Sequence, residues 1–163
     1  MNKQRVYITS GVSGSGKSTY IKNHNLDSVS SDEIVEDYTK ENGFNYTEAF
    51  DEIQSKKLFG SLNSIFFDNI AHNIKSGKDF VIDRTSLNSF TRKSLVELIR
   101  TNGDVEIVVV YFDIPRETII KRLKDREAKT GKGIPDFVIE KQFESFTKPT
   151  FEEGYDRLEV IKS

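Results

Sequence analysis

The sequence has no cysteine, no tryptophan and only two histidines among its 163 residues. Without cysteine, the chain can form no disulfide, has no thiol nucleophile and cannot build a cysteine-ligated zinc site. The two histidines, His24 and His72, are far apart in the sequence and do not have the spacing of metal ligands. These absences exclude thiol and disulfide chemistry, and they leave no pattern for a structural metal.

Long apolar runs and a strong charge of one sign are also absent. No apolar stretch approaches the roughly 18 residues that a membrane-spanning helix needs. The first ten residues, MNKQRVYITS, lack the apolar core of a signal peptide. We therefore expect a cytoplasmic protein without a membrane partner. The balance of 24 Lys+Arg against 26 Asp+Glu argues against indiscriminate coating of nucleic acid, although it is compatible with a local basic groove.

The apolar residues that are present predict strands alternating with helices. The nearly continuous run from Val105 to Phe112 is typical of a parallel strand covered on both faces. Apolar residues at steps of three or four from Leu58 onward predict a helix that ends at Gly77. This alternation predicts a parallel sheet of right-handed βαβ units, in one domain over residues 1–163. The other predicted strands are 5–10, a short piece at Val29, 80–83 and 158–161; the other helices are 17–24, one after Ser30 or Ser31, one from Ser89 or Thr91, one from Pro115, and one after the loop 129–135 to about Phe146.

The stretch Gly11–Ser18 reads GVSGSGKS and matches the phosphate-loop pattern G-x-x-x-x-G-K-[ST], with a predicted strand before it and a predicted helix after it. Glycines let the backbone curl so that successive N–H groups face one concavity, and the helix N-terminus adds positive charge there. Lys17 is expected to reach the β- and γ-phosphates of a nucleoside triphosphate, and Ser18 to bind Mg²⁺. The predicted nucleotide contacts are Gly11, Ser13, Gly14, Ser15, Gly16, Lys17, Ser18 and Thr19. The alternative is a Gly/Ser-rich turn without a ligand.

Two carboxylates are candidates for the chemistry beside this loop. Asp32 follows the second short strand, at the edge where open α/β sheets bind ligands, and could accept the proton of an acceptor hydroxyl. Asp83 ends the third predicted strand and could hold Mg²⁺ or organise the acceptor. Each could instead be an ordinary capping acid near a helix or turn. Arg84 and Arg92 are candidate contacts for acceptor phosphates, and a surface position fits each of them equally well.

Arg122 and Arg126 are four residues apart and share one face of a predicted helix. They precede a glycine-containing loop, which suits a mobile lid over about 122–135 whose guanidinium groups close on the transferring phosphoryl. The alternative is a solvated helix face. No guanine-reading N-K-x-D motif is present, and the third strand ends in a single carboxylate, so group transfer is favoured over a GTP switch or a motor.

Five stretches taken together resemble the 5′-hydroxyl polynucleotide kinases, both the phage type and the kinase domain of the kinase–phosphatases. After the phosphate loop come Ser31-Asp32-Glu33, Val81–Asn88, the arginine pair at the phage lid spacing, and Phe143–Tyr155. The resemblance implies a three-layer α/β P-loop NTPase fold with an adenylate-kinase-like sheet of about five strands and a helical lid. It also implies ATP and Mg²⁺ as cofactors, Asp32 as general base, base contacts near 149–154, a nucleic acid 5′-end as acceptor, and the cytoplasm (of the host, if phage-encoded) as compartment.

Departures from that family's pattern concern the acceptor. Ser31 replaces a basic residue, Val35 stands where the phage type has an arginine, and Thr85-Ser86 replaces Thr-Asn. The spelling of the phosphate loop also resembles that of gluconate kinases, so a small-molecule kinase acting on a nucleoside, nucleotide or sugar acid is the second hypothesis. A third is a nucleotide-dependent binding module without catalysis. The phosphatase motif Asp-x-Asp-Gly-Thr is absent from the sequence.

Overall fold

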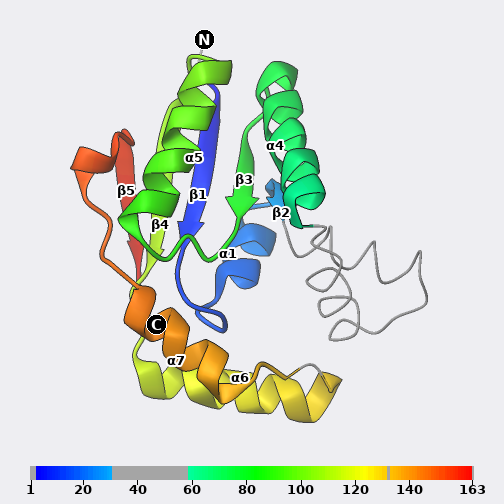
Figure 1. Cartoon of the computed structure of the whole chain (residues 1–163), viewed down its shortest axis with the longest axis vertical. Helices are drawn as coiled ribbons and strands as arrows, with labels where there is room; N and C mark the ends of the chain where they lie inside the picture. Colours follow the sequence, from blue (N-terminus) through cyan, green and yellow to red (C-terminus); the bar gives the residue numbers. More distant parts are fainter. Residues whose placement is uncertain (1–2, 31–58, 132, 163) are drawn as a thin grey trace.

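A computed structural model describes residues 3–30, 59–131 and 133–162, with the backbone alone for 59–63. At its centre is one sheet of five parallel strands in the order β2-β3-β1-β4-β5 (Figure 1). The strand order reverses beside β1, and in open α/β sheets ligands bind at the carboxyl ends of the strands next to such a reversal. This sheet confirms the predicted α/β P-loop NTPase-like fold. The strands are β1 (Arg5–Ser10), β2 (Asp27–Ser30), β3 (Phe80–Asp83), β4 (Glu106–Phe112) and β5 (Arg157–Ile161).

Side chains alternate between the two faces of the sheet, and each face packs against different helices. On one face, α4 (Phe59–Ser76) and α5 (Ser89–Asn102) cover a core that includes Val6, Ile8 and Ile107, none of which is exposed (Figure 1). On the other face, Tyr20 of α1 (Lys17–Asn23) packs against the alternate residues of β4, namely Val108, Val110 and Phe112. The nearly unbroken apolar run of β4 is therefore explained by burial on both sides.

The second face becomes polar at the amino ends of the strands. Glu106 lies beside Arg5 at 3.5 Å and Arg157 at 3.2 Å, and parallel pairing sets Arg5 opposite Glu106 on β1 and β4. These charges continue the face that carries Val108 and Val110 further along β4. On this face, the alternating pattern of β4 therefore places a charged, solvated strip at the amino ends of the strands and an apolar patch under α1 further along.

Helix boundaries follow local capping chemistry. Phe66, Ile70 and Ile74 recur at steps of four on the buried side of α4, and Gly77 follows its end at φ +76°. Asn88 caps α5, because its Oδ1 accepts the Thr91 N–H at 2.8 Å, so α5 starts at Ser89, the first of the two predicted starts. No helix in the described part of the chain combines the length and apolar character needed to cross a membrane.

Two helices lie across the carboxyl ends of the strands (Figure 1). They are α6 (Arg116–Thr130), preceded by Pro115, and α7 (Asp136–Ser145), followed later by the short 3₁₀ helix η1 (Phe151–Glu153). The predicted loop 129–135 starts late, because α6 continues to Thr130 and ends at Gly131 with φ +70°. Residues 122–135, predicted as a lid, are thus the second half of α6 and the connection to α7.

Candidate active site

The phosphate-loop residues connect β1 to α1 in the conformation that the motif requires. Gly14 and Gly16 have φ values of +84° and +102°, which L side chains rarely adopt. At Gly11 a Cβ atom would lie 2.6 Å from Ser15 Oγ and 2.9 Å from Phe112 Cβ, so there is no room for a side chain. The Gly11 N–H donates to Thr85 O at 2.9 Å and ties the loop to the segment after β3. These glycines therefore let the chain curl tightly between β1 and α1, as a phosphate-binding loop requires.

Lys17 lies over this loop. Its Nζ donates to Gly11 O at 3.0 Å and to Val12 O at 2.8 Å. These carbonyls keep the ammonium within the region where phosphates would bind. Of the other predicted nucleotide contacts, Ser15 is buried, while Ser18 and Thr19 are exposed in the first turn of α1.

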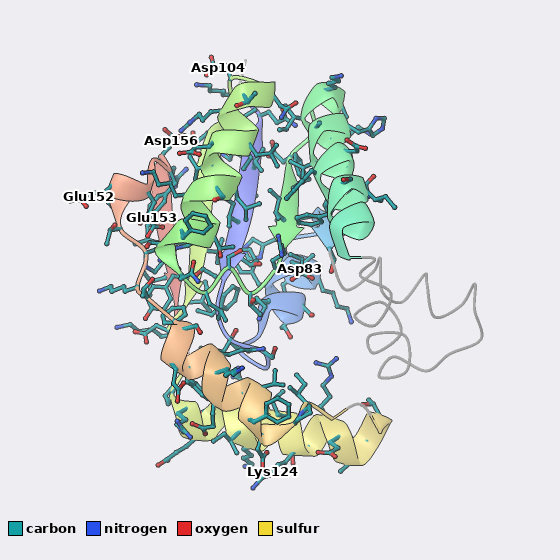
Figure 2. The ribbon with its side chains drawn as sticks, viewed as in Figure 1. Asp83, Asp104, Lys124, Glu152, Glu153 and Asp156 are labelled. Atoms are coloured by element: carbon teal, nitrogen blue, oxygen red, sulfur yellow. The ribbon has the colours of Figure 1, made fainter. Side chains whose placement is uncertain are left out.

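Ser18 and Asp83 line one open cavity of about 340 Å³ beside α1, the α1–β2 connection and the end of β3. Figure 2 shows Asp83 at the carboxyl end of β3. A hydroxyl and a carboxylate supply the oxygen ligands that Mg²⁺ prefers, and Mg²⁺ usually retains several waters and phosphate oxygens. Within 3–30, 59–131 and 133–162, no group of three or more His, Asp or Glu could hold a metal. The donor set thus fits Mg²⁺ bound together with a nucleotide better than a resident metal ion.

Helix α6 packs directly on the phosphate loop. A Cβ atom at Gly14 would lie 2.9 Å from Leu123 Cγ, and Arg122 Nη1 is 3.5 Å from Gly14 O. Arg126 lies one turn further along the helix and is exposed. Lys124 extends from the opposite side of α6, away from the sheet (Figure 2). The structure therefore brings Arg122 to the loop, with Arg126 next to it on the same helix face.

Gln142 of α7 also contacts the loop, and the sequence analysis did not identify it. The Ser13 N–H donates to Gln142 Oε1 at 2.8 Å. Gln142 is a polar residue on a face of α7 that also carries Ile139 and Phe143, at the i, i+3, i+4 spacing. A polar residue on an apolar helix face was the signal in the sequence that could have found it.

Arg92 requires a correction. The prediction that it contacts an acceptor phosphate is wrong, because its side chain is 0% exposed and its guanidinium is fully engaged. It forms a two-point ion pair with Glu153 at 2.7 and 2.9 Å and donates to Ser10 Oγ, Ser86 O and Thr147 Oγ1. A charge so deeply buried needs such partners. Arg92 therefore joins β1, the segment after β3 and η1 from within.

Two further predicted residues have different outcomes. The Arg84 guanidinium lies 4.9 Å from the centre of the Phe66 ring on α4 and is half-buried, so part of its surface is used in packing. Asp32, the predicted general base, lies outside the described residues, as do Ser31 and Val35.

The stretch 149–154, where base contacts were expected, packs against the start of α5. The Thr147 N–H donates to Leu87 O at 2.8 Å, and Glu153 is buried against Arg92 between η1 and α5 (Figure 2). Its role in base binding stays a prediction.

The helix after the loop is anchored at its far side by Tyr20. Its hydroxyl donates to Glu159 Oε2 at 2.7 Å, and the ring stacks on His24 with 3.9 Å between ring centres. Burial, and then the hydrogen bond to Glu159, raises the pKa of Tyr20 well above its ordinary value. Tyr20 is therefore a neutral donor at physiological pH and fixes α1 to β5.

Comparisons with solved structures agree with this architecture. A kinase candidate from Chloroflexus aurantiacus has a TM-score of 0.73 at 14% identity, over 99% of this chain and 86% of that one. A fungal RNA kinase has 0.64 at 12%, over 99% and 75%, and a gluconokinase from Sinorhizobium meliloti has 0.56 at 17%, over 99% and 84%. At these identities the likeness shows the fold alone.

Sequence comparison gives the family. No curated protein matches the sequence. A family model described as an AAA domain matches residues 6–149, which include the phosphate loop, Asp83, the α6 arginines and Gln142. Because this match covers most of the chain, and because the phosphate loop has the geometry described above, the chain belongs to the AAA domain family of P-loop proteins.

Proposed function

We propose that this protein is an ATP- and Mg²⁺-dependent kinase that transfers a phosphoryl group to the 5′-hydroxyl of DNA or RNA. The observation that carries the proposal is the arrangement around the phosphate loop. Arg122 approaches it from α6, while Ser18 and Asp83 share a cavity at the other side. Phosphoryl transfer depends on positioning and on stabilising phosphate charge, and this arrangement offers cationic and metal-binding groups on both flanks of the loop. Membership of a P-loop family and the kinases among the structural neighbours support the reaction class.

Each residue has a role that follows from its chemistry. The backbone N–H groups of the loop and Lys17 would bind the phosphates, with Lys17 exchanging its present carbonyl partners for phosphate oxygens. Ser18 and Asp83 would hold Mg²⁺, which neutralises phosphate charge when bound. Arg122 and Arg126 would close on the transferring phosphoryl group. The side chains of α6 therefore supply the charge stabilisation that water would otherwise give.

The proposed general base is Asp32. As the new P–O bond forms, the acceptor hydroxyl loses its proton, and a carboxylate beside it can accept that proton. Replacing such a base typically slows turnover by roughly 10²–10⁴-fold. This assignment rests on the sequence position of Asp32, two residues after Ser30, the last residue of β2.

The acceptor is the part of the proposal with a rival. The order of motifs from the phosphate loop to Phe143–Tyr155 favours a polynucleotide end, and a fungal RNA kinase is a structural neighbour. A small-molecule hydroxyl is the second candidate, because a gluconokinase is also a neighbour and the net charge of −2 suits a small acceptor.

The test is transfer of label from γ-labelled ATP, with Mg²⁺, to 5′-hydroxyl DNA and RNA oligonucleotides beside nucleosides and sugar acids. We expect label at the oligonucleotide 5′-end, lost in Lys17→Ala and reduced in Asp32→Asn and Asp83→Asn. Asp68→Asn, on the exposed side of α4, is the matched carboxylate control and should retain activity. Label only on a small molecule would select the second candidate, and no transfer despite ATP binding would overturn both.

A further inference from the structure

Gln142 occupies a position that neither the family pattern nor the motif explains. Its carboxamide reaches the phosphate loop from 129 residues away in the sequence, and its Oε1 accepts the Ser13 N–H at 2.8 Å. Ser13 lies in the loop between Gly11 and Gly14, beside the point where α6 packs through Leu123. Gln142 and Arg122 therefore meet the same stretch of the loop from two different helices.

A glutamine carboxamide has two chemical ends. The oxygen is an acceptor, and the –NH₂ group carries two donors. Among the residues described, the contact with Ser13 is the single hydrogen bond of this carboxamide. With Oε1 fixed on a backbone N–H of the loop, the –NH₂ group is held within a few ångströms of the loop, where it can donate to an anion. A methionine or leucine would suit the apolar face of α7 as well and would offer neither end.

Contacts with α6 and β4 flank Gln142. Arg116 of α6 forms an ion pair with Glu140, and its guanidinium lies 4.9 Å from the centre of the Phe143 ring. Directly after α7, Phe146 packs on Tyr111 near the end of β4, with 5.4 Å between ring centres. Gln142 lies between Glu140 and Phe143, the two residues that contact Arg116. Its position against the loop is thus supported by contacts with α6 as well as by its own hydrogen bond.

We propose that Gln142 is a phosphate-binding residue that recognises the terminal phosphate of the nucleoside triphosphate. Its Oε1 holds the loop at Ser13, and its Nε2 donates to a γ-phosphate oxygen. We assign the γ-phosphate for two reasons. Ser13 and Gly14 precede the N-terminus of α1, which would hold the inner phosphates. They also lie under α6, the helix that carries Arg122 and Arg126. This inference rests on the proposed function only in requiring that the loop bind a nucleotide.

The test compares affinities for ADP and for the non-hydrolysable β,γ-imido analogue of ATP, by calorimetry with Mg²⁺ on the whole chain. Gln142→Met removes both ends of the carboxamide. Because this variant loses a hydrogen bond to a charged group, we expect its affinity for the triphosphate analogue to fall by roughly 10- to 100-fold. Its affinity for ADP should change by less than about threefold. Lys141→Met, the exposed neighbour on α7, is the matched control and should leave both affinities unchanged.

A second variant separates phosphate recognition from support of the loop. Gln142→Glu retains an acceptor for the Ser13 N–H but has no donor, so we expect it to lose triphosphate affinity at least as strongly as Gln142→Met. Triphosphate binding by Gln142→Glu within threefold of wild type would overturn the proposal. So would equal weakening of both nucleotides in Gln142→Met, since that result describes a loop support.

These outcomes are separable from those of the kinase proposal. Selective loss of triphosphate binding in a protein that phosphorylates no acceptor would support Gln142 while overturning the proposed reaction. If the Gln142 variants weaken ADP and triphosphate binding equally while the wild-type chain is an active kinase, the role of Gln142 is overturned and the proposed reaction is supported. A wild-type chain that binds neither nucleotide would overturn both.

Discussion

At the scale of single residues, the ion pair between Arg92 and Glu153 shows how much one buried charge can organise. The two side chains are 0% and 4% exposed, and 61 residues separate them in the sequence. Because both charges lose their hydration on burial, the ion pair adds little stability compared with two apolar side chains. Removing one partner, however, leaves an uncompensated buried charge. Replacing a single charged atom of this pair should therefore have a large effect on the stability of the fold.

Glu153→Gln should destabilise the fold by about 3–5 kcal/mol, because it removes the charge and leaves Arg92 buried without its counter-ion. Urea unfolding at neutral pH measures this change. Glu140→Gln is the matched control, since Glu140 pairs with Arg116 at the surface, where the side chains are 47% and 51% exposed. An exposed pair contributes no more than about 1 kcal/mol. Equal midpoints for the two variants would contradict the structural role of Arg92.

At the scale of elements, the edge of the sheet depends on a clamp at the start of β5. Asp156 Oδ2 accepts the Ile107 N–H of β4 at 2.8 Å and also pairs with Arg100 of α5 at 2.8 Å. Burial acts to raise the pKa of Asp156, but the hydrogen bonds from Ile107 and Arg100 outweigh it, and the pKa lies below its ordinary value. Three elements are therefore joined by a carboxylate that must be ionised.

The sign of the pH effect follows from that lowered pKa. Asp156 stabilises the fold above the pKa that it has in the unfolded chain, about 4, and this contribution is lost as the pH falls through the folded value. Asp156→Asn should thus be less stable than wild type at pH 7, with the gap in stability narrowing as the pH falls below about 4. Asp104→Asn, which changes an exposed partner of Lys3, is the control. A gap that is independent of pH would rule out the clamp. Urea unfolding at several pH values measures it.

At the scale of the whole molecule, the candidate site draws on both ends of the chain. The phosphate loop follows β1, Asp83 ends β3, and α6 and α7 bring Arg122 and Gln142 across the same edge of the sheet (Figure 1). A ligand bound there is held by elements that otherwise meet mainly through the sheet. Nucleotide binding should therefore raise the stability of the whole fold.

We expect ATP with Mg²⁺ to raise the melting temperature. A ligand at 100 times its Kd adds about 2.7 kcal/mol of stability, which corresponds to roughly 5–10 °C for a chain of this size. Differential scanning fluorimetry over a series of ATP concentrations measures the shift. Lys17→Ala should abolish it, whereas Lys75→Ala, in the last turn of α4, should retain it. A full shift in Lys17→Ala would mean that ATP binds elsewhere.

Much of the fold was predictable because its signals are local. The run Val105–Phe112, the stretch Phe80–Asp83 and the strand before the phosphate loop were predicted within a residue of β4, β3 and β1. Buried parallel strands appear in the sequence as short apolar runs. A helix ends where a glycine such as Gly77 allows a positive φ. The end of α6 was less clear, because Lys129 and Thr130 continue a helix as easily as they start a loop.

The sequence by itself determined the sheet, the phosphate loop and the chemistry that such a loop can perform, because periodicity and motif spacing are properties of neighbouring residues. Only the tertiary structure decided that Arg92 is an internal ion-pair partner of Glu153 and that Gln142 reaches Ser13. Both pairs join segments far apart in the chain, and which distant polar groups meet depends on how the helices pack over the sheet. A local pattern can mark Gln142 as a polar residue on an apolar helix face, but it does not say which distant group the residue meets. In the same way, an arginine on a helix looks the same in sequence whether it binds phosphate or a buried carboxylate.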